Sequence, residues 1–211
     1  MAKRNLKIAE KPPKEFLAET IRSITDISEV NLQKILDIFE SVTFDKNTKI
    51  IKEGEITSYV YFVSKGIIRV YYHSVGKELI DWFAEEGSFI GNLYSHIMQK
   101  PGFDIYESIE DVALLRTQYS DLEKLFKQNH EIESAARRVL EQYYVKYVER
   151  VHHLKGLPAD EKYHLFQQHY GEFVQRIPLK FVADYLGISS ETLSRIRGKD
   201  NKKKIKKITR N

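Results

Sequence analysis

The sequence IPLKFVADYLGISSETLSRIR, residues 177–197, predicts two short helices joined by a tight turn. The first helix is expected at 179–186, because Gly187 suits the left-handed residue that ends a helix. Ser189 is a good N-cap for the second helix, since its hydroxyl can accept from a free backbone N–H. The stretch therefore predicts a helix-turn-helix unit.

The outward side of the second helix carries hydroxyls, one acid and guanidinium groups, whereas Leu193 and Ile196 would face inward. Such groups can reach the base edges and phosphates of double-stranded DNA. The candidate DNA-binding residues are Ser189, Ser190, Glu191, Thr192, Ser194, Arg195 and Arg197. The alternative is a plain helical hairpin with a solvated outer face. Turn, cap and outer-face chemistry agree with each other, which favours a recognition helix at about 190–198.

The stretch resembles the helix-turn-helix signature of the Crp/Fnr family of bacterial transcription regulators, at Ala183, Gly187, Ser189, Glu191, Thr192 and Arg195. The run 185–197 looks especially like the Bacteroidetes branch of that family. The resemblance implies that Glu191 accepts from cytosine N4 and that Arg195 donates to guanine. Ser190 stands where the family often has an Arg, so the family's operator sequence cannot be carried over.

A basic tail follows the expected recognition helix. Residues 199–211 carry a net charge of +6 in a chain whose net charge is +4, so the first 198 residues sum to −2. We expect Lys199, Lys202 and Lys203 to grip phosphates; a solvated tail is the alternative. Most Crp/Fnr proteins continue into a β-hairpin wing, and this tail is too short and too charged for one. The wing is therefore expected to be reduced or absent.

The part of the chain between 42 and 117 predicts short strands in a sandwich or roll. The expected strands lie at 48–52, 59–63, 67–73, 78–83, 105–109 and 112–116, with glycines in the gaps between them. The stretches 52–55, 61–70 and 83–91 are similar to the cyclic-nucleotide-binding β-roll of Crp/Fnr sensors. The fold class is thus expected to be α+β, a β-roll (jelly-roll-like) followed by a helical DNA-binding domain.

The expected β-roll pocket lacks the polar groups of a cyclic-nucleotide site. In the relatives a Gly-Glu pair holds the ribose and an Arg-Ser or Arg-Thr pair holds the phosphate, whereas this chain has Asn92 after Gly91, and Lys100-Pro101. We therefore expect neither cyclic AMP nor cyclic GMP, but an unknown small effector. Candidate pocket residues are Arg69, Tyr71, Trp82, Asn92, Leu93, Tyr94, His96 and Lys100, the alternative being that these side chains only fill the roll. No cofactor and no metal site is identified, because the histidines lack ligand spacing.

A long helix is expected between roll and DNA-binding unit. Its apolar stripe consists of Ile132, Ala136, Val139, Tyr143, Tyr147, Val151 and Leu154. Such a stripe favours a homodimer through helix 129–155, the alternative being a monomer in which it packs on its own domain. The expected division is 1–128 (N-terminal helices and β-roll), 129–155 (dimerisation helix) and 156–211 (helix-turn-helix domain with basic tail).

Composition narrows the class of protein. The chain has no Cys, which excludes thiol redox sensing and cysteine-ligated clusters, and no apolar run long enough for a membrane span. No glycine-rich phosphate loop or nucleophile elbow points to an enzyme. The sequence therefore predicts a cytoplasmic, dimeric DNA-binding transcription regulator without membrane association, with RNA polymerase as a possible partner. The alternative function is a cyclic-nucleotide-type sensor module acting through protein partners.

Overall fold

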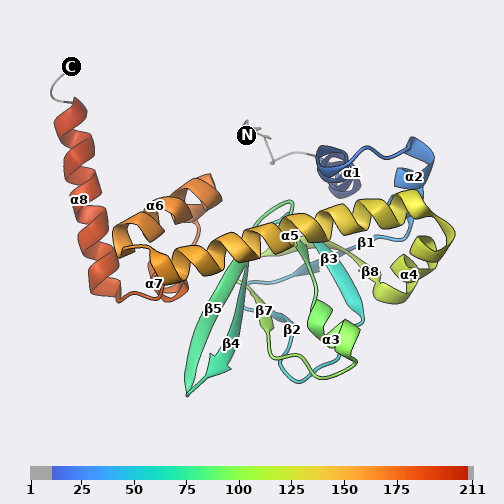
Figure 1. Cartoon of the computed structure of the whole chain (residues 1–211), viewed down its shortest axis with the longest axis horizontal. Coiled ribbons are helices and arrows are strands. Elements are labelled where there is room, and N and C mark those ends of the chain that lie inside the picture. The colour runs from blue at the N-terminus through green and yellow to red at the C-terminus, as the bar shows by residue number, and fades with distance from the viewer. Residues whose placement is uncertain (1–10, 209–211) are drawn as a thin grey trace. The chain divides into compact units, whose positions relative to one another are not determined.

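A computed structural model describes the backbone of residues 11–208 and the side chains of residues 11–199. The chain divides into two compact units, Met1–Tyr144 and Val145–Asn211. This boundary lies inside helix α5 (His130–Gly156), which spans both units (Figure 1). The division into three parts expected from the sequence stays a prediction.

The first unit contains a β-roll of two four-stranded antiparallel sheets. One sheet has the order β1-β8-β3-β6, formed by Glu40–Phe44, Val112–Gln118, Tyr59–Lys65 and Phe89–Ile90. The other has the order β2-β7-β4-β5, formed by Lys49–Ile51, Ile105–Ser108, Ile68–Ser74 and Lys77–Ala84. Apolar side chains from both sheets, among them Val63, Leu114, Val70 and Tyr106, form a common core. The six expected strands are present; β1 and β6 are additional.

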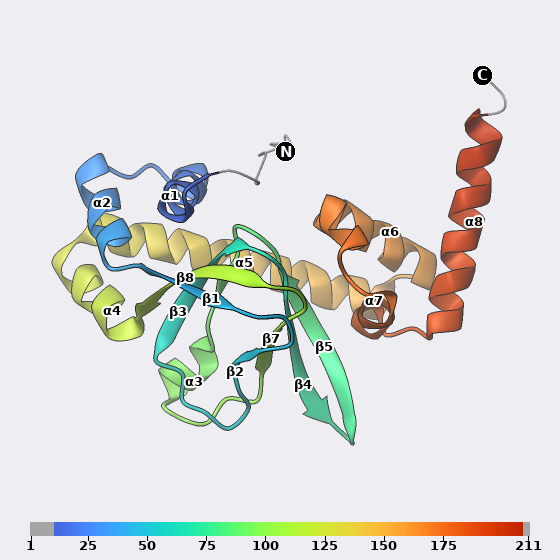
Figure 2. The same cartoon turned by 180° about the vertical axis from the view of Figure 1, so that it is seen from behind.

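Two N-terminal helices cover the β1-β8-β3-β6 sheet, as Figure 2 shows from behind. Helix α1 (Pro13–Ile24) inserts Phe16, whose ring meets that of Phe62 on β3 at 5.3 Å, edge to face. Helix α2 (Glu29–Asp37) is tied to the start of α5, because Glu131 accepts from the Ser28 backbone N–H at 2.7 Å. Hydrogen bonds from Ser28 and Asn31 hold the pKa of the Glu131 carboxyl below its ordinary value.

Helix α4 (Tyr119–Gln128) comes after β8, and α5 follows it. The apolar stripe of α5 is divided differently from the expected seam. Ile132 is buried in the first unit, and Ala136, Val139 and Tyr143 line a cavity of that unit, so this half of the seam packs on the chain's own fold. Tyr147 of the expected seam is exposed, and so are three large apolar side chains of α5 outside that seam, Leu140, Tyr144 and Val145.

The second unit is helical: α6 (Ala159–Tyr170), the 3-10 turn Gly171–Gln175, α7 (Leu179–Leu186) and α8 (Ser190–Ile208). Its core is formed by Tyr163, Phe166, Tyr170, Ile177, Val182, Ala183, Leu186, Leu193 and Ile196. Helix α7 has the bounds expected from the sequence. Helix α8 runs beyond the expected end near residue 198, so in the part of the tail that the structure describes, up to Ile208, the backbone is helical and no strand of a wing occurs.

The turn between β3 and β4 depends on Gly66. Its φ of +96° lies in the left-handed region, and its N–H donates to the buried Glu86 carboxylate at 2.8 Å. A Cβ at this position would lie 2.6 Å from Val112 Cγ1 and 2.9 Å from the Asp111 carbonyl oxygen. Both backbone conformation and space therefore require glycine here.

Asp104, just before β7, couples the stability of the first unit to pH. Burial, and after it the charge of Asp81, raise the pKa of Asp104 from 3.8 to about 6. Because the folded state holds this proton more tightly than the unfolded state, the free energy of unfolding is expected to fall as pH rises from about 4 to about 6. Asp104→Asn should flatten that fall and stabilise the unit at pH 7 by about 1 kcal/mol, since solvent screening reduces the about 3 kcal/mol of the full shift.

The measurement is urea unfolding followed through Trp82, the only tryptophan of the chain, which lies in the first unit. The profiles of wild type and Asp104→Asn are compared between pH 4 and 7. Parallel profiles would show that Asp104 does not carry this proton in the folded state.

Candidate functional site

The turn between α7 and α8 is fixed by its own hydrogen bonds. Gly187 is left-handed, with φ +65°, and its N–H donates to carbonyl oxygens of Ala183 and Asp184 at the end of α7. The Ser189 hydroxyl accepts from the Thr192 backbone N–H at 3.2 Å, as expected of an N-cap. These contacts hold the first turn of α8 in a defined position relative to α7.

The two sides of α8 differ in chemistry. Leu193 and Ile196 are buried against the second unit, as the sequence predicts. On the outside, Ser189, Ser190, Glu191, Ser194 and Arg195 are exposed, and Thr192 and Arg197 are partly exposed. The structure thus brings these seven candidate residues to one accessible surface.

Glu191 lies at the N-terminal end of α8. Its own backbone N–H and the Ser189 hydroxyl hold the pKa of the Glu191 carboxyl below its ordinary value. The side chain is therefore an ionised hydrogen-bond acceptor at neutral pH, which is the form needed to accept from an amino group. Arg195, one turn later, supplies donors next to it.

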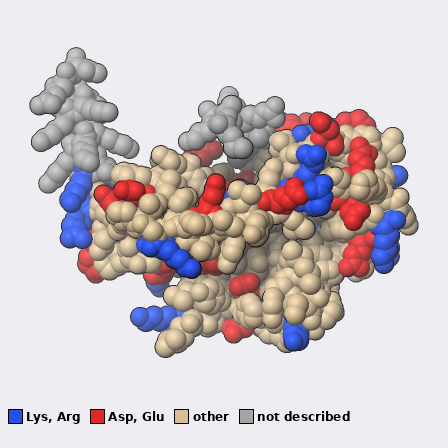
Figure 3. Space-filling view, viewed as in Figure 1, with Lys and Arg blue, Asp and Glu red and all other residues tan. Residues whose placement is uncertain are grey.

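The described end of α8 is basic. Arg195, Arg197 and Lys199 follow each other at every second position, and Figure 3 shows Lys and Arg side chains gathered beside the undescribed atoms of the tail. Lys202 and Lys203 lie outside the described side chains. Beside this end, Leu179 of α7 and Ser190, Leu193, Ser194, Arg197 and Gly198 of α8 line a hollow of about 420 Å³.

Two candidate pocket residues, Arg69 and Tyr71, lie on β4. Their polar atoms are bonded to acidic side chains of the same sheet, β2-β7-β4-β5. Arg69 is 7 % exposed and pairs with Glu78 at 2.7 Å and with Glu107 at 3.2 Å. The Tyr71 hydroxyl donates to Glu107 at 2.8 Å, and burial and this bond raise the pKa of Tyr71. The positive charge of Arg69 is thereby balanced by carboxylates of the chain itself, which removes it as a phosphate clamp.

Three further candidates, Asn92, Tyr94 and Lys100, lie in or next to helix α3 (Leu93–Met98), and each has a different environment. Asn92 is 2 % exposed and caps α3, accepting from the Ser95 backbone N–H at 3.0 Å. A Cβ at Gly102 would lie 1.9 Å from Asn92 Nδ2, so the two residues pack directly on each other. Tyr94 is exposed and its ring lies 4.6 Å from that of Phe103; Lys100 is exposed after the helix.

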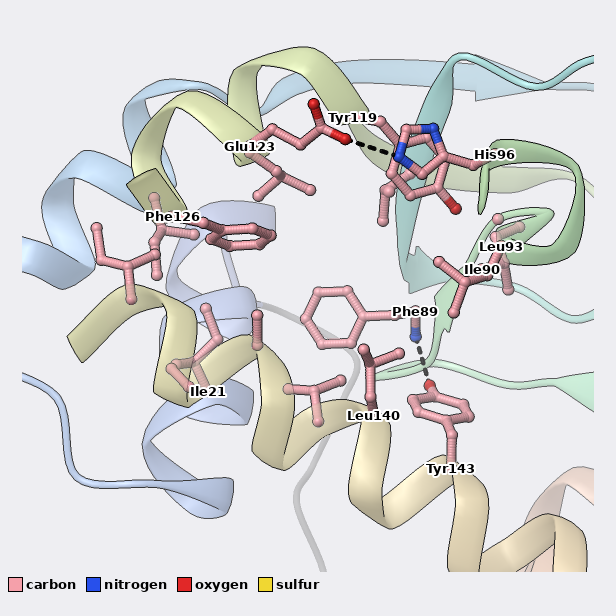
Figure 4. A pocket seen from close by; sticks show the side chains of 18 of the residues that line it. Ile21, Phe89, Ile90, Leu93, His96, Tyr119, Glu123, Phe126, Leu140 and Tyr143 are labelled. Carbon is pink, nitrogen blue, oxygen red and sulfur yellow. Dashed lines mark hydrogen bonds and ion pairs between the residues drawn. The ribbon is translucent and has the colours of Figure 1, made fainter. Parts of the chain in front are cut away.

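The remaining three candidates, Trp82, Leu93 and His96, line one cavity of about 460 Å³ in the first unit (Figure 4). The other lining residues come from α1, α2, α4, α5 and the strands β3 and β6: Ile21, Ile35, Phe39, Val60, Phe89, Ile90, Gly91, Tyr119, Leu122, Glu123, Phe126, Ile132, Ala135, Ala136, Val139, Leu140 and Tyr143. The contribution of α5 was not predicted, because the apolar spacing of this helix was assigned to a dimer seam. The eight expected pocket residues therefore do not form one site.

The described residues contain no group of three or more His, Asp or Glu side chains able to hold a metal ion. Within the same part of the chain, no helix combines the length and the apolar character required to cross a membrane.

Comparison with known proteins identifies the fold of both parts. Residues 41–129 match the cyclic nucleotide-binding domain family. Among similar solved structures, the c-di-GMP responsive global regulator CLP of Xanthomonas campestris is 16 % identical, with 83 % of this chain and 93 % of that chain covered and a TM-score of 0.66. FixK2 of Bradyrhizobium japonicum is 21 % identical, with coverages of 80 % and 87 % and a TM-score of 0.68.

The catabolite activator protein of Thermus thermophilus is 16 % identical, with 87 % of each chain covered and a TM-score of 0.54. No curated protein sequence matches the chain. At these identities the structures establish a common fold. The chain has a cyclic nucleotide-binding domain, and its structure is similar to those of Crp/Fnr-family regulators.

Proposed function

We propose that this protein is a dimeric DNA-binding transcription regulator of the Crp/Fnr type, with α8 entering the major groove. The observation that carries the proposal is the two-sided character of α8: Leu193 and Ile196 are buried, while Glu191 and Arg195 are exposed beside each other. An acceptor and a bidentate donor on one exposed turn are suited to cytosine N4 and guanine O6/N7. The similarity to regulators over more than four fifths of the chain supports the same function.

The dimer of this proposal forms through α5. Leu140, Tyr144 and Tyr147 are exposed apolar or aromatic side chains at spacings of four and three, so they form one stripe on the helix. A second copy would cover this stripe by two-fold symmetry. Two copies of α8 would then contact half-sites about 34 Å apart on one side of the duplex.

The sensor part of the proposal concerns an effector other than cyclic AMP or cyclic GMP. Asn92, which occupies the position of the ribose-binding Glu, is used to cap α3, and Arg69 is paired with Glu78 and Glu107. RNA polymerase is the partner that such a regulator would recruit or block. The position of the operator decides whether binding activates or represses transcription.

Salt dependence tests the DNA-binding part directly. We expect selection from a random duplex pool to yield a two-fold symmetric site, and binding to that site to weaken steeply with salt, because basic side chains release counterions from phosphates. Lys199→Ala should reduce the slope of log affinity against log salt by about 1 per subunit, hence by about 2 per dimer, and weaken all sequences equally. Fluorescence anisotropy of labelled duplexes between 50 and 300 mM salt, roughly the range over which phosphate contacts dominate, measures it.

Lys127→Ala serves as the control, because Lys127 is an exposed lysine of α4 in the first unit, whereas α8 belongs to the second unit. If the selected pool showed no sequence preference at physiological salt, the DNA-binding proposal would fail. The chain would then act as a cyclic-nucleotide-type sensor module through protein partners.

A further inference from the structure

One unexplained feature of the first unit is the cavity lined by α4, α5 and the β6–α3 segment (Figure 4). Its volume of about 460 Å³ falls in the range of small-molecule sites, roughly 300–1,000 Å³. In Figure 4 the rings of Phe89 and Phe126 point into it, and α5 forms one wall. Neither the cyclic-nucleotide fold nor DNA binding requires a hollow at this place.

The wall is mostly apolar, and the polar side chains of His96, Glu123 and Tyr143 that reach it are engaged in hydrogen bonds. His96 Nε2 lies 3.0 Å from Glu123 Oε1, and the His96 ring stacks on Tyr119 at 3.8 Å. The Tyr143 hydroxyl accepts from the Phe89 backbone N–H at 2.7 Å, and burial raises the pKa of Tyr143 to about 12. Tyr143 is therefore neutral at physiological pH.

The charge of the wall decides which ligands fit. Among the described residues that line the cavity there is no Lys and no Arg, and the one acid, Glu123, is paired with His96. A phosphate or carboxylate placed here would lose its hydration without gaining a cation, which is strongly unfavourable. A hydrocarbon or aromatic ring would instead replace water along Ala136, Val139 and Trp82.

We propose that this cavity binds an uncharged, largely apolar small molecule. The binding itself is independent of DNA, while its use as the effector signal rests on the function proposed above. The ligand would contact five residues of α5, from Ala135 to Tyr143, and so stabilise the helix that carries the exposed dimer stripe. Neither Arg69 nor Asn92 lines the cavity, although Gly91 and Leu93 on either side of Asn92 do.

The chain carries its own reporter for this site, because its only tryptophan, Trp82, lines the cavity. The probe is N-phenyl-1-naphthylamine, a neutral apolar dye that emits strongly in apolar surroundings and accepts energy from tryptophan. We expect saturable dye emission on excitation of Trp82 in the full-length protein without DNA. The neutral 1-decanol should displace the dye, whereas decanoate and cyclic AMP should do so at least tenfold less well.

Ala136→Phe and Val139→Phe place an aromatic ring inside the cavity, and each should weaken dye binding at least tenfold. Gln142→Phe adds the same ring at an exposed position of α5 that does not line the cavity, and it should bind the dye like the wild type. Circular dichroism confirms that each variant is folded. The two substitutions fill the cavity at different positions. If one variant does not fold, dye binding by the other variant still tests the proposal.

Non-saturable dye emission, or equal dye affinity in wild type and in both filled variants, would overturn the proposal. Equally strong displacement by decanoate would overturn its uncharged character. Each result is separate from DNA binding, because the duplex measurements above use no dye. A protein that binds DNA but not the dye would refute the ligand site alone, and one that binds the dye but not DNA would refute the proposed function alone.

Discussion

Replacing Arg195 with alanine is expected to lower the affinity for the selected operator at least roughly thirtyfold while leaving much of the non-specific binding. A bidentate arginine–guanine contact contributes about 1–3 kcal/mol of discrimination. A symmetric dimer loses one such contact in each half-site, so the loss is at least about 2 kcal/mol, or roughly thirtyfold. Anisotropy titrations against the operator and against duplexes changed at single base pairs measure it.

The specific signature of Arg195→Ala is the pattern over sequences. Discrimination should disappear at one base pair of each half-site and persist at the others, whereas Lys199→Ala should lower every affinity by the same factor. Arg195 is exposed and does not contribute to the core of the second unit, so folding is expected to be unaffected. Equal weakening of all duplexes by Arg195→Ala would show that this guanidinium contacts phosphate and not a base.

Gly66→Ala is expected to destabilise the first unit by about 2–5 kcal/mol. A left-handed residue with a Cβ costs about 1–2 kcal/mol, and forcing an atom into a packed site costs about 1–3 kcal/mol more. The new methyl would lie 2.6 Å from Val112 Cγ1, on a strand that cannot move without disturbing its pairing with β3 and β1. Urea unfolding followed by Trp82 fluorescence reports this unit.

Gly76→Ala is the matched control for that substitution. Gly76 also has a positive φ, +73°, but no atom lies within 4 Å of the position of its Cβ. Gly76→Ala thus has the conformational cost of a left-handed residue with a Cβ, about 1–2 kcal/mol, but no steric clash. If the two variants were equally stable, the close contact at Gly66 would contribute nothing, and the strands would have to relax around the methyl.

The order of elements along the chain was predictable from the sequence, and the exceptions have physical reasons. Helix 179–186 has the predicted bounds, because Gly187 is a clear boundary residue at its end. Strand β1, ESVTF at Glu40–Phe44, has no fully buried residue and so no strong apolar alternation. Strand β6 has two residues, too few for any pattern.

The candidate sites were predictable to different degrees. The outer face of α8 depends on local spacing within one helix, which a sequence displays directly. The cavity depends on segments more than 100 residues apart, from Ile21 of α1 to Tyr143 of α5, and no local pattern signals that such residues meet. Ala136 and Val139 have the spacing of a helical stripe in either case, and only the fold distinguishes a pocket wall from a dimer seam.

The contact between Gly102 and Asn92 links two positions that evolution would have to change together. Any side chain at position 102 would displace Asn92, and with it the cap of α3. A variant with a larger residue at 102 would therefore need a smaller residue at 92. Conversely, a glutamate at position 92 has no room, because the loop between α3 and β7 passes close to the side chain at this position. A glutamate at position 92 would therefore require the loop between α3 and β7 to be rebuilt.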